Sequence, residues 1–327
     1  MENMKPPTYR DVLRAERRIR PYLAPTPMFR YPGIDALIGT EVWIKREDTQ
    51  PIGVFKVRGG LNLVSQLDPE TKARGVAAAS TGNHGQSVAY AAREFGVPAT
   101  IVVPERANPG KVAAMKAMGA DVLFHGRDFD FARRYCEELC RERGYRYIHA
   151  GDEPLLIAGV GTIALEMLRA EPDLDVLMVP LGGGSGAAAA SIVAEATSAE
   201  LEVIAVQSEA SPSAYRSWQQ GELVEAPNET FAEGLATGTS FALPQQVLKR
   251  GLSDFVLVGE DDLLSAMVWL LERAHVLSEG AGAAGLAGAY KLRERLAGKK
   301  VGIVLTGGNV STETLRRALE HGDRMGT

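Results

Sequence analysis

The stretch Gln50-Pro51-Ile52-Gly53-Val54-Phe55-Lys56-Val57-Arg58-Gly59-Gly60 separates a strand-like run from a segment with helical apolar periodicity. Pro51 and Gly53 indicate a turn, which places Lys56 at the start of a helix. The positive end of the helix dipole and nearby apolar groups both disfavour a charged lysine there and lower its pKa. A neutral amine is what a Schiff-base lysine requires, although most single lysines are surface residues. Lys56 is therefore a candidate nucleophile whose case depends on other motifs.

The composition is that of a globular chain. It has 327 residues, of which 45% are apolar and 24% charged, with a net charge of −5, and this length suits two domains. No basic cluster favours nucleic acid, no apolar run is long enough to cross a bilayer, and the N-terminus lacks the apolar core of a signal peptide. We expect a cytoplasmic protein with a small-molecule substrate and no nucleic-acid or membrane partner.

The cysteines and histidines do not indicate a metal site. Cys136 and Cys140 are the only two cysteines, and their spacing matches neither a CxxC motif nor a complete ligand set. The five histidines are scattered and form no HExxH motif. We expect no bound metal ion.

Strands and helices alternate along most of the chain. The predicted strands cover residues 41–45, 76–80, 99–103, 121–124, 176–179, 202–206, 255–258 and 301–305. The predicted helices cover 8–20, 82–95, 110–118, 129–143, 154–170, 187–196, 214–219, 261–275 and 281–297, with a last helix from 311. Most of 208–241 is predicted to be loop. This alternation indicates an α/β fold.

A glycine-rich loop, Leu181-Gly182-Gly183-Gly184-Ser185-Gly186, lies between a predicted strand and an alanine-rich helix. Residues without side chains allow backbone N–H groups to converge on a phosphate at the positive end of that helix. Two alternatives stay open. Residues 184–189 satisfy a relaxed GxGxxA dinucleotide fingerprint followed by Glu209, and the loop is also compatible with a tight turn alone.

Two further strand ends carry polar groups. Ser80-Thr81-Gly82-Asn83-His84-Gly85-Gln86 combines small hydroxyls, an amide and a helix start, which suits a carboxylate. The same residue types often only cap helices, and a lone histidine is more often structural. Leu305-Thr306-Gly307-Gly308-Asn309 ends the last strand, where Thr306 can hydrogen-bond a ligand or simply belong to a turn.

In their order along the chain, these motifs resemble those of the fold-type II pyridoxal-phosphate enzymes, in the branch of serine/threonine dehydratases (threonine ammonia-lyases) and serine racemases. The resemblance covers nearly the whole chain. It is carried by Pro25-Thr26-Pro27, Lys45-Arg46-Glu47-Asp48, Phe55-Lys56-Val57-Arg58-Gly59, residues 80–86, Gly159-Val160-Gly161-Thr162, residues 182–186, Glu279-Gly280-Ala281-Gly282-Ala283 and residues 306–309.

The resemblance implies an α/β fold of two doubly wound open sheets with flanking helices. Residues 1–50 and 151–327 would form a large cofactor-binding domain and residues 51–150 a small domain, with pyridoxal 5'-phosphate in the cleft between them. A homodimer or homotetramer is also implied.

The resemblance further implies roles for individual residues. Lys56 is similar to the catalytic lysine that bonds covalently to the cofactor, and Phe55 to the residue packed against the cofactor ring. Asn83 corresponds to the amide beside the ring hydroxyl, and Thr306 to the group beside the ring nitrogen. The implied cofactor-binding residues are Phe55, Lys56, Asn83, Gly182, Gly183, Gly184, Ser185, Gly186, Glu279 and Thr306, and the implied substrate-binding residues are Ser80, Thr81, Gly82 and His84.

The reaction implied by the resemblance is β-elimination from L-threonine or L-serine, which gives a 2-oxo acid and ammonia, with Lys56 removing the Cα proton. The alternatives are a racemase of serine or another amino acid, a dehydratase of another β-hydroxy amino acid such as 3-hydroxyaspartate, and a β-replacement synthase. A nicotinamide-dependent oxidoreductase, which depends on the GxGxxA pattern alone, and a non-catalytic cofactor-binding relative complete the set.

The chain departs from the family's pattern at several positions. Val54 stands where a serine is usual, and Ser185 and Gly186 replace a glycine and an apolar residue. Thr81 replaces the second serine of the racemases, which disfavours racemisation by two bases. Glu209 is the one acid at the racemases' divalent-cation site, so magnesium is not expected. Because the chain ends soon after residue 309, we expect no C-terminal regulatory domain.

Overall fold

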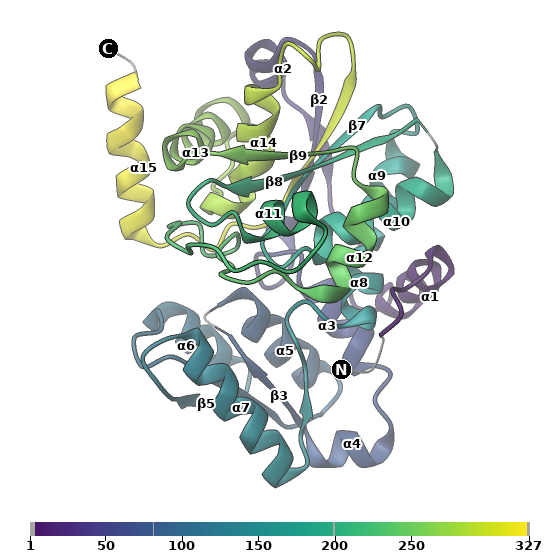
Figure 1. Ribbon diagram of the computed structural model, residues 1–327, viewed down its shortest axis with the longest axis vertical. Helices are drawn as coiled ribbons and strands as arrows, with labels where there is room; N and C mark the ends of the chain where they lie inside the picture. Colours follow the sequence, from purple (N-terminus) through teal and green to yellow (C-terminus); the bar gives the residue numbers. More distant parts are fainter. Residues whose placement is uncertain (1–3, 81, 199, 326–327) are drawn as a thin grey trace.

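The computed structural model describes residues 4–80, 82–198 and 200–325, which form two lobes, each built on its own sheet (Figure 1). The strands of the larger sheet, in spatial order, are β1 (Met28–Arg30), β2 (Glu41–Arg46), β10 (Lys300–Leu305), β7 (Val176–Pro180), β8 (Glu202–Ser208) and β9 (Asp254–Val258). Those of the smaller sheet are β5 (Asp121–Phe124), β4 (Ala99–Val103), β3 (Val76–Ala79) and β6 (Arg146–Tyr147). Edge strand β1 is antiparallel to β2, and the other strand pairs are parallel.

Helices connect the strands. Those of the large lobe are α1 (Tyr9–Ile19), α2 (Pro32–Ile38), α8 (Pro154–Val160), α9 (Thr162–Ala170), α10 (Ser185–Thr197), α11 (Ser213–Gln220), α12 (Ala242–Gly251), α13 (Glu260–Ala274), α14 (Gly280–Lys291) and α15 (Thr312–Met325). Those of the small lobe and its junction are the 3-10 helix η1 (Glu47–Thr49), α3 (Val57–Val64), α4 (Pro69–Arg74), α5 (Asn83–Glu94), α6 (Pro109–Ala117) and α7 (Phe129–Arg143).

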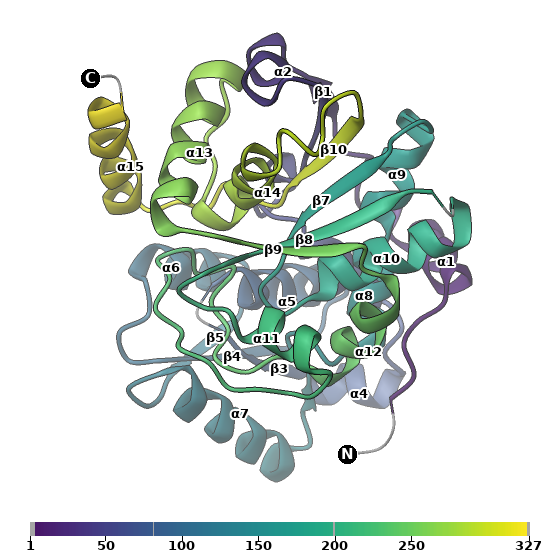
Figure 2. The ribbon, with the colours of Figure 1, turned by 45° about the horizontal axis from the view of Figure 1, so that its top comes forward.

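The large sheet is buried on both faces. Along β7, Val176 and Met178 pack into one hydrophobic cluster together with residues of α13 and α14. Leu177 and Val179 point to the opposite face and join a cluster with residues of α9, α10 and α12. Alternate strand residues face opposite sides of a sheet, so a strand covered on both sides is apolar throughout. Figure 2 shows these helices on the two sides of the strands.

The small sheet is covered in the same way. Val76 and Ala78 of β3 face a cluster that includes residues of α3, α5 and α6. Ala77 and Ala79 face α7. The first of these clusters also contains Leu156 of α8, so the two lobes share apolar contacts beside α3.

Several elements differ from the sequence-based expectations. The helix predicted over 154–170 is two helices, α8 and α9, which meet at Gly161, where α1 crosses closely. A Cβ on Gly161 would lie 2.7 Å from Val12 Cγ2. The helix predicted over 281–297 ends at Lys291. The sequence analysis assigned no element to β1, α2, α4, β6 or α12, which are short or, in α12, carry a proline in the first turn.

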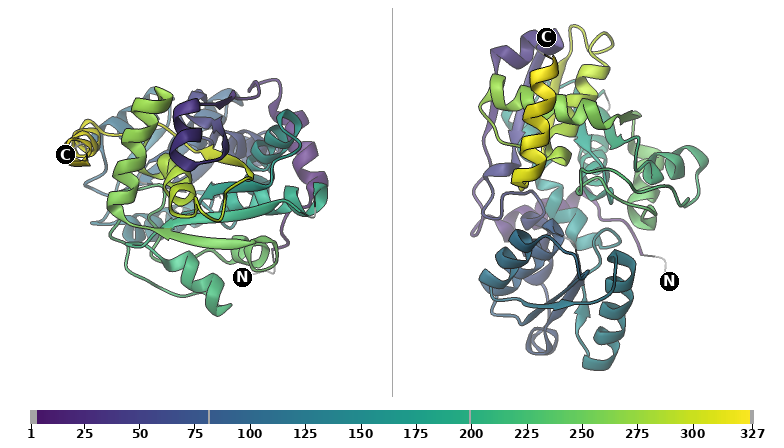
Figure 3. Two further views of the ribbon diagram at one scale, coloured as in Figure 1. Left: turned by 90° about the horizontal axis from the view of Figure 1, so that it is seen from above. Right: turned by 90° about the vertical axis from the view of Figure 1, so that its left-hand side faces the viewer.

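Helix α15 lies beside α13 on the outside of the large lobe (Figure 3). Among the described helices, none combines the length and the apolar character needed to cross a membrane. No group of three or more His, Cys, Asp or Glu residues within the described ranges is placed to hold a metal ion.

Candidate active site

Lys56 immediately precedes α3, at the carboxyl end of the large sheet. The turn before it is closed by a hydrogen bond of 2.7 Å from the Gly53 amide to the Gln50 carbonyl oxygen. The Phe55 amide donates to the Thr306 carbonyl oxygen at 3.0 Å, and Val54 forms a β-bridge with Gly307. The Lys56 turn therefore lies directly beside the end of β10.

The Lys56 side chain is placed to act as a neutral amine. Burial lowers the pKa of Lys56, while the Glu279 carboxylate acts in the opposite direction. No described residue accepts a hydrogen bond from Nζ, which lies 5.4 Å from the centroid of the Phe55 ring. An unpartnered amine with a lowered pKa can act both as a nucleophile and as a base.

The glycine-rich loop supplies a row of free backbone donors. Among the described residues, none accepts a hydrogen bond from the amides of residues 182–187, which precede the first bonded amide of α10, that of Ala188. Gly184 has φ of +90°, which favours glycine at this position. A Cβ on Gly182 would lie 2.1 Å from the Gly234 carbonyl oxygen. Free amides at a helix start bind anions, phosphate above all.

Two hydroxyl groups complete this side of the site. Neither Ser185 nor Thr306, both buried, donates a side-chain hydrogen bond to another described residue. Thr306, Gly186 and Phe55 line one cavity with apolar side chains of α9, α10 and β7. The structure thus brings the lysine turn, the phosphate loop and the last strand end together.

Asn83, Glu279 and Asn309 link the two lobes. The Asn83 side-chain amide donates to Glu279 Oε1 at 2.8 Å, and the Asn309 amide donates to Asn83 Oδ1 at 3.0 Å. Burial raises the pKa of Glu279, while the positive charge of Lys111 and the Asn83 hydrogen bond lower it. Asn83 was predicted to face a ligand, and in this structure its amide is bound to Glu279.

The loop that precedes α5 contains the predicted substrate-binding residues. Ser80 Oγ accepts hydrogen bonds from the amides of Gly82 and Gly85 at 3.0 and 2.8 Å, so Ser80 shapes the loop. His84 Nε2 lies 3.0 Å from the Ile148 carbonyl oxygen, and burial lowers the pKa of His84 to about 3. The ring is neutral, and Nε2 donates to that carbonyl. Thr81 lies outside the described residues.

This loop also offers free donors. The amides of Asn83 and His84, in the first turn of α5, have no acceptor within the described part of the chain. Two such amides at the positive end of a helix suit a carboxylate. The roles of Ser80, Gly82 and His84 toward a substrate stay predictions.

A buried charged cluster behind α3 received no role in the sequence analysis. The Arg58 guanidinium pairs with Glu47 and Glu166 at 2.6–2.8 Å, and Lys45 Nζ pairs with Glu166 at 2.7 Å. Thr26 Oγ1 donates to Glu47 at 2.6 Å. Four of these five residues, all but Glu166, belong to the motifs that carry the resemblance, and their polar or charged side chains within those motifs were the available signal. Their meeting point required the fold.

The donor set fits pyridoxal phosphate. The free amides of residues 182–187 match a phosphate group, and the unpartnered Lys56 amine matches the aldehyde of the cofactor. The free Thr306 hydroxyl suits a ring nitrogen. Fold and site together define the class of α/β enzymes that carry out chemistry with a lysine-bound pyridoxal phosphate.

Comparison with known proteins agrees with this class. The sequence model of the family described as pyridoxal-phosphate dependent enzyme matches residues 19–307, and the chain belongs to that family. This family assignment replaces the dinucleotide-binding alternative for the glycine-rich loop. Glu209, the acid that follows the GxGxxA pattern, pairs with Lys291 at 3.0 Å.

Curated relatives are ammonia-lyases. The chain is 36% identical to the L-threonine ammonia-lyase of Thermotoga maritima, over 96% of this chain and 79% of the relative. It is 37% identical to the L-threo-3-hydroxyaspartate ammonia-lyase of Saccharomyces cerevisiae, over 93% and 94% of the two chains. Among solved structures, maize serine racemase superposes with a TM-score of 0.91 at 29% identity, covering 98% of this chain and 99% of the racemase.

Proposed function

We propose that this chain is a pyridoxal-phosphate-dependent ammonia-lyase that converts L-threonine or L-serine to a 2-oxo acid and ammonia. The observation that carries the proposal is the buried Lys56 amine, which has a lowered pKa and no hydrogen-bond partner among the described residues. The ammonia-lyase relatives, at 36–37% identity over more than nine-tenths of the chain, support the same reaction class.

Each group of the site has a task in this reaction. When bound, pyridoxal phosphate supplies an electron-withdrawing ring that stabilises negative charge at the substrate Cα. The amides of residues 182–187 hold the phosphate, with Ser185 Oγ beside them. The loop at Ser80, Gly82 and His84 binds the substrate carboxylate through the first-turn amides of α5.

Lys56 acts as the base. Its neutral Nζ takes the proton from Cα, and the β-hydroxyl leaves as water by taking up one proton, so that the proton removed from Cα is balanced by the one that the hydroxyl gains. The resulting unsaturated amine is released and hydrolysed, so that the net products are the 2-oxo acid and ammonia. Thr306 would supply a neutral hydroxyl to the ring nitrogen of the cofactor and would leave that nitrogen unprotonated, which would favour elimination over chemistry that needs a stronger electron sink.

The second candidate is the same elimination on 3-hydroxyaspartate. The relative from Saccharomyces cerevisiae, which covers almost the whole chain, favours it. Racemisation has the support of the similar racemase fold.

Three further expectations accompany the proposal. Residues 1–50 and 151–327 would form the large cofactor-binding domain and residues 51–150 the small domain, with the cofactor in the cleft between them. The enzyme would be cytoplasmic and would form a homodimer or homotetramer. Light scattering during size-exclusion chromatography measures the oligomeric state.

The proposal is tested by Lys56→Ala. Without the amine, Cα-proton transfer loses its base, and turnover of L-threonine and L-serine should fall by about a thousandfold or more. The visible absorbance of the lysine-bound cofactor should disappear from the purified protein. Oxo-acid release and an absorbance scan measure the two effects.

The matched control is Lys116→Ala, which removes an exposed lysine on α6 whose Nζ lies over the Phe124 ring. It should leave both the colour and the turnover intact. Full turnover by Lys56→Ala would contradict the assigned role. Wild-type protein without activity on any β-hydroxy amino acid would contradict the proposed function.

A further inference from the structure

A second lysine, Lys111, lies against the predicted carboxylate loop. It is the third residue of α6, and its side chain runs along Gly82. A Cβ on Gly82 would lie 2.9 Å from Lys111 Cδ and 3.2 Å from Nζ. The ammonium group is therefore in contact distance of the loop that we expect to hold the substrate carboxylate. Lys111 belongs to none of the motifs that were assigned a role from the sequence.

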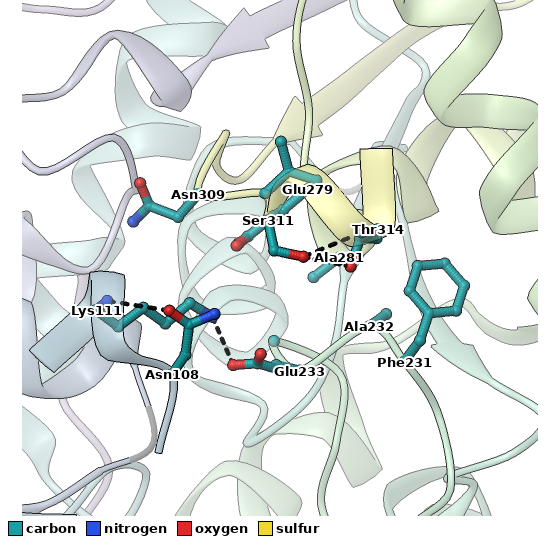
Figure 4. A pocket seen from close by; sticks show the side chains of 13 residues that line it. Asn108, Lys111, Phe231, Ala232, Glu233, Glu279, Ala281, Asn309, Ser311 and Thr314 are labelled. Atoms are coloured by element: carbon teal, nitrogen blue, oxygen red, sulfur yellow. Dashed lines mark hydrogen bonds and ion pairs between the residues drawn. The ribbon is translucent and has the colours of Figure 1, made fainter. Parts of the chain in front are cut away.

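Lys111 forms an ion pair across the two lobes. Its Nζ donates to the carboxylate of Glu233, in the loop between α11 and α12 of the large lobe (Figure 4). The Lys111 side chain is 12% exposed, whereas that of Glu233 is 49% exposed. An ion pair with a half-exposed partner is screened by water and salt and contributes little. Lys111 can therefore exchange this partner for another anion.

The pair lines a pocket at the edge of the site. Its wall includes Glu279 and Asn309 of the large lobe, which both hydrogen-bond Asn83 (Figure 4). It also includes Asn108, which caps the N-terminus of α6. Lys111 is the one cation among the described residues of the wall, and Glu233 and Glu279 are the acids. The positive charge of Lys111 also acts on buried Glu279. The pocket thus contains one ammonium group positioned between two carboxylates and the substrate loop.

The number of negative charges on a substrate decides how strongly the Lys111 ammonium group attracts it. L-Threonine has one carboxylate, while 3-hydroxyaspartate has two that are separated by only two carbon atoms. Because Lys111 Nζ lies beside Gly82, a molecule whose first carboxylate is bound at this loop can direct its second carboxylate to the same ammonium group. Coulomb attraction to Lys111 grows with each added negative charge on the substrate, and the Glu233 carboxylate repels that charge.

We propose that Lys111 is a specificity-determining residue, whose ammonium group favours dicarboxylic β-hydroxy amino acids such as 3-hydroxyaspartate over L-threonine, and that Glu233 opposes this preference by pairing with it. The inference rests on the proposed function, because it names a substrate class for the same site. The Lys111–Glu233 ion pair then sets the ratio of kcat/KM for 3-hydroxyaspartate to kcat/KM for L-threonine.

The first test compares kcat/KM for L-threo-3-hydroxyaspartate and for L-threonine in the holoenzyme. Lys111→Met should lower the ratio of the two values by about five- to tenfold, the effect of one screened charge at short range. Lys111→Arg should retain the ratio, and Glu233→Gln should raise it. Lys116→Met removes the same charge from the same helix away from the loop and should not change it.

Equal losses for both substrates in Lys111→Met, or no loss for either, would overturn the proposal. Lys111→Gln provides a second variant with a polar side chain, and circular dichroism verifies that each variant is folded. A ratio that follows charge rather than side-chain shape identifies an electrostatic role, because a merely structural lysine would affect both substrates alike.

A binding experiment judges the inference without turnover. L-Malate and L-lactate differ by one carboxylate and lack the amino group that the reaction requires. Calorimetric titration of the holoenzyme should show that Lys111→Met weakens L-malate binding about fivefold more than L-lactate binding. Equal weakening, or a wild-type enzyme without preference for L-malate, overturns the inference. If the wild type has no turnover but prefers L-malate and loses that preference in Lys111→Met, the proposed function is contradicted and the inference about Lys111 is not.

Discussion

Burial sets the chemistry of individual charged residues in this site. Lys56 and Glu279 are opposite charges that interact inside the protein, yet burial shifts the pKa of each toward its neutral form. The cost of removing a charge from water exceeds the attraction that one partner returns. At Lys56 this shift favours the neutral amine, which is the form that abstracts a proton. His84 is neutral for the same reason, with its ring bound to a backbone carbonyl.

The raised pKa of Glu279 makes stability depend on pH. Below its ordinary value of 4.5, the carboxyl is protonated in both folded and unfolded chains. As pH rises above that value, the unfolded chain ionises first, so the folded state loses stability until pH passes the folded pKa. Relative to Glu279→Gln, the wild-type free energy of unfolding should therefore decrease from about pH 4.5 upward.

Urea unfolding of both proteins at a series of pH values measures this difference. A difference that stays constant across the series would show that Glu279 ionises equally easily in the folded and unfolded chains.

At the scale of elements, two glycines allow α3 and α8 to cross closely. A Cβ on Gly59 would lie 2.9 Å from the Leu156 carbonyl oxygen, and one on Gly159 would lie 2.6 Å from the Arg58 carbonyl oxygen. Backbone atoms cannot move aside as a flexible side chain can. This crossing holds α3, and with it Lys56, against the large lobe. Gly186 of α10 has room for a side chain, because a Cβ there would lie 3.5 Å from its nearest neighbour, Val179 Cγ1.

Replacing glycine by alanine should therefore change the free energy of unfolding in opposite directions in α8 and α10. Gly159→Ala should lower the free energy of unfolding by about 1–3 kcal/mol, as overpacking does. Gly186→Ala, which projects into the cavity beside Phe55, should raise it by about 0.5–1 kcal/mol by restricting the unfolded chain. Chemical denaturation of the two variants measures both effects. A loss of stability in Gly186→Ala would show that the cavity has no room for a methyl group.

At the scale of the whole molecule, the buried charged cluster joins the lobes. Arg58 extends from α3 to Glu47 of η1 and Glu166 of α9, while α3 also packs against α5 of the small lobe. Two cations and two carboxylates balance within it, and Glu47 and Arg58 are almost inaccessible to water. Burial opposes the charge on Glu47, but Arg58 together with Thr26 and Lys45 outweighs burial and lowers the pKa of Glu47. The predicted boundary at residue 51 thus falls at a segment bound to both lobes.

Breaking this cluster should destabilise the whole protein. Arg58→Met leaves a buried carboxylate without its partner and should lower the free energy of unfolding by about 3–5 kcal/mol. Arg74→Met removes an exposed pair with Glu70 and should cost about 1 kcal/mol or less. Urea denaturation measures both variants. Similar losses in the two would mean that the cluster contributes no more than a surface ion pair.

The sequence by itself determined the features encoded within a few neighbouring residues. Alternating periodicity indicated an α/β fold, Pro51 and Gly53 placed Lys56 at a helix start, and the glycines of 182–186 indicated an anion loop. Each follows from local backbone freedom and side-chain spacing. The break at Gly161 escaped prediction, because it depends on where α1 crosses.

Only the tertiary structure decided which distant groups meet. Asn83 and Glu279 are 196 residues apart, and Lys111 and Glu233 are 122 apart. Their contacts depend on how the lobes are placed, and no local pattern records that placement. The lowered pKa of Lys56 belongs to both levels. The sequence placed the amine at the positive end of a helix, and the fold removed the water around it.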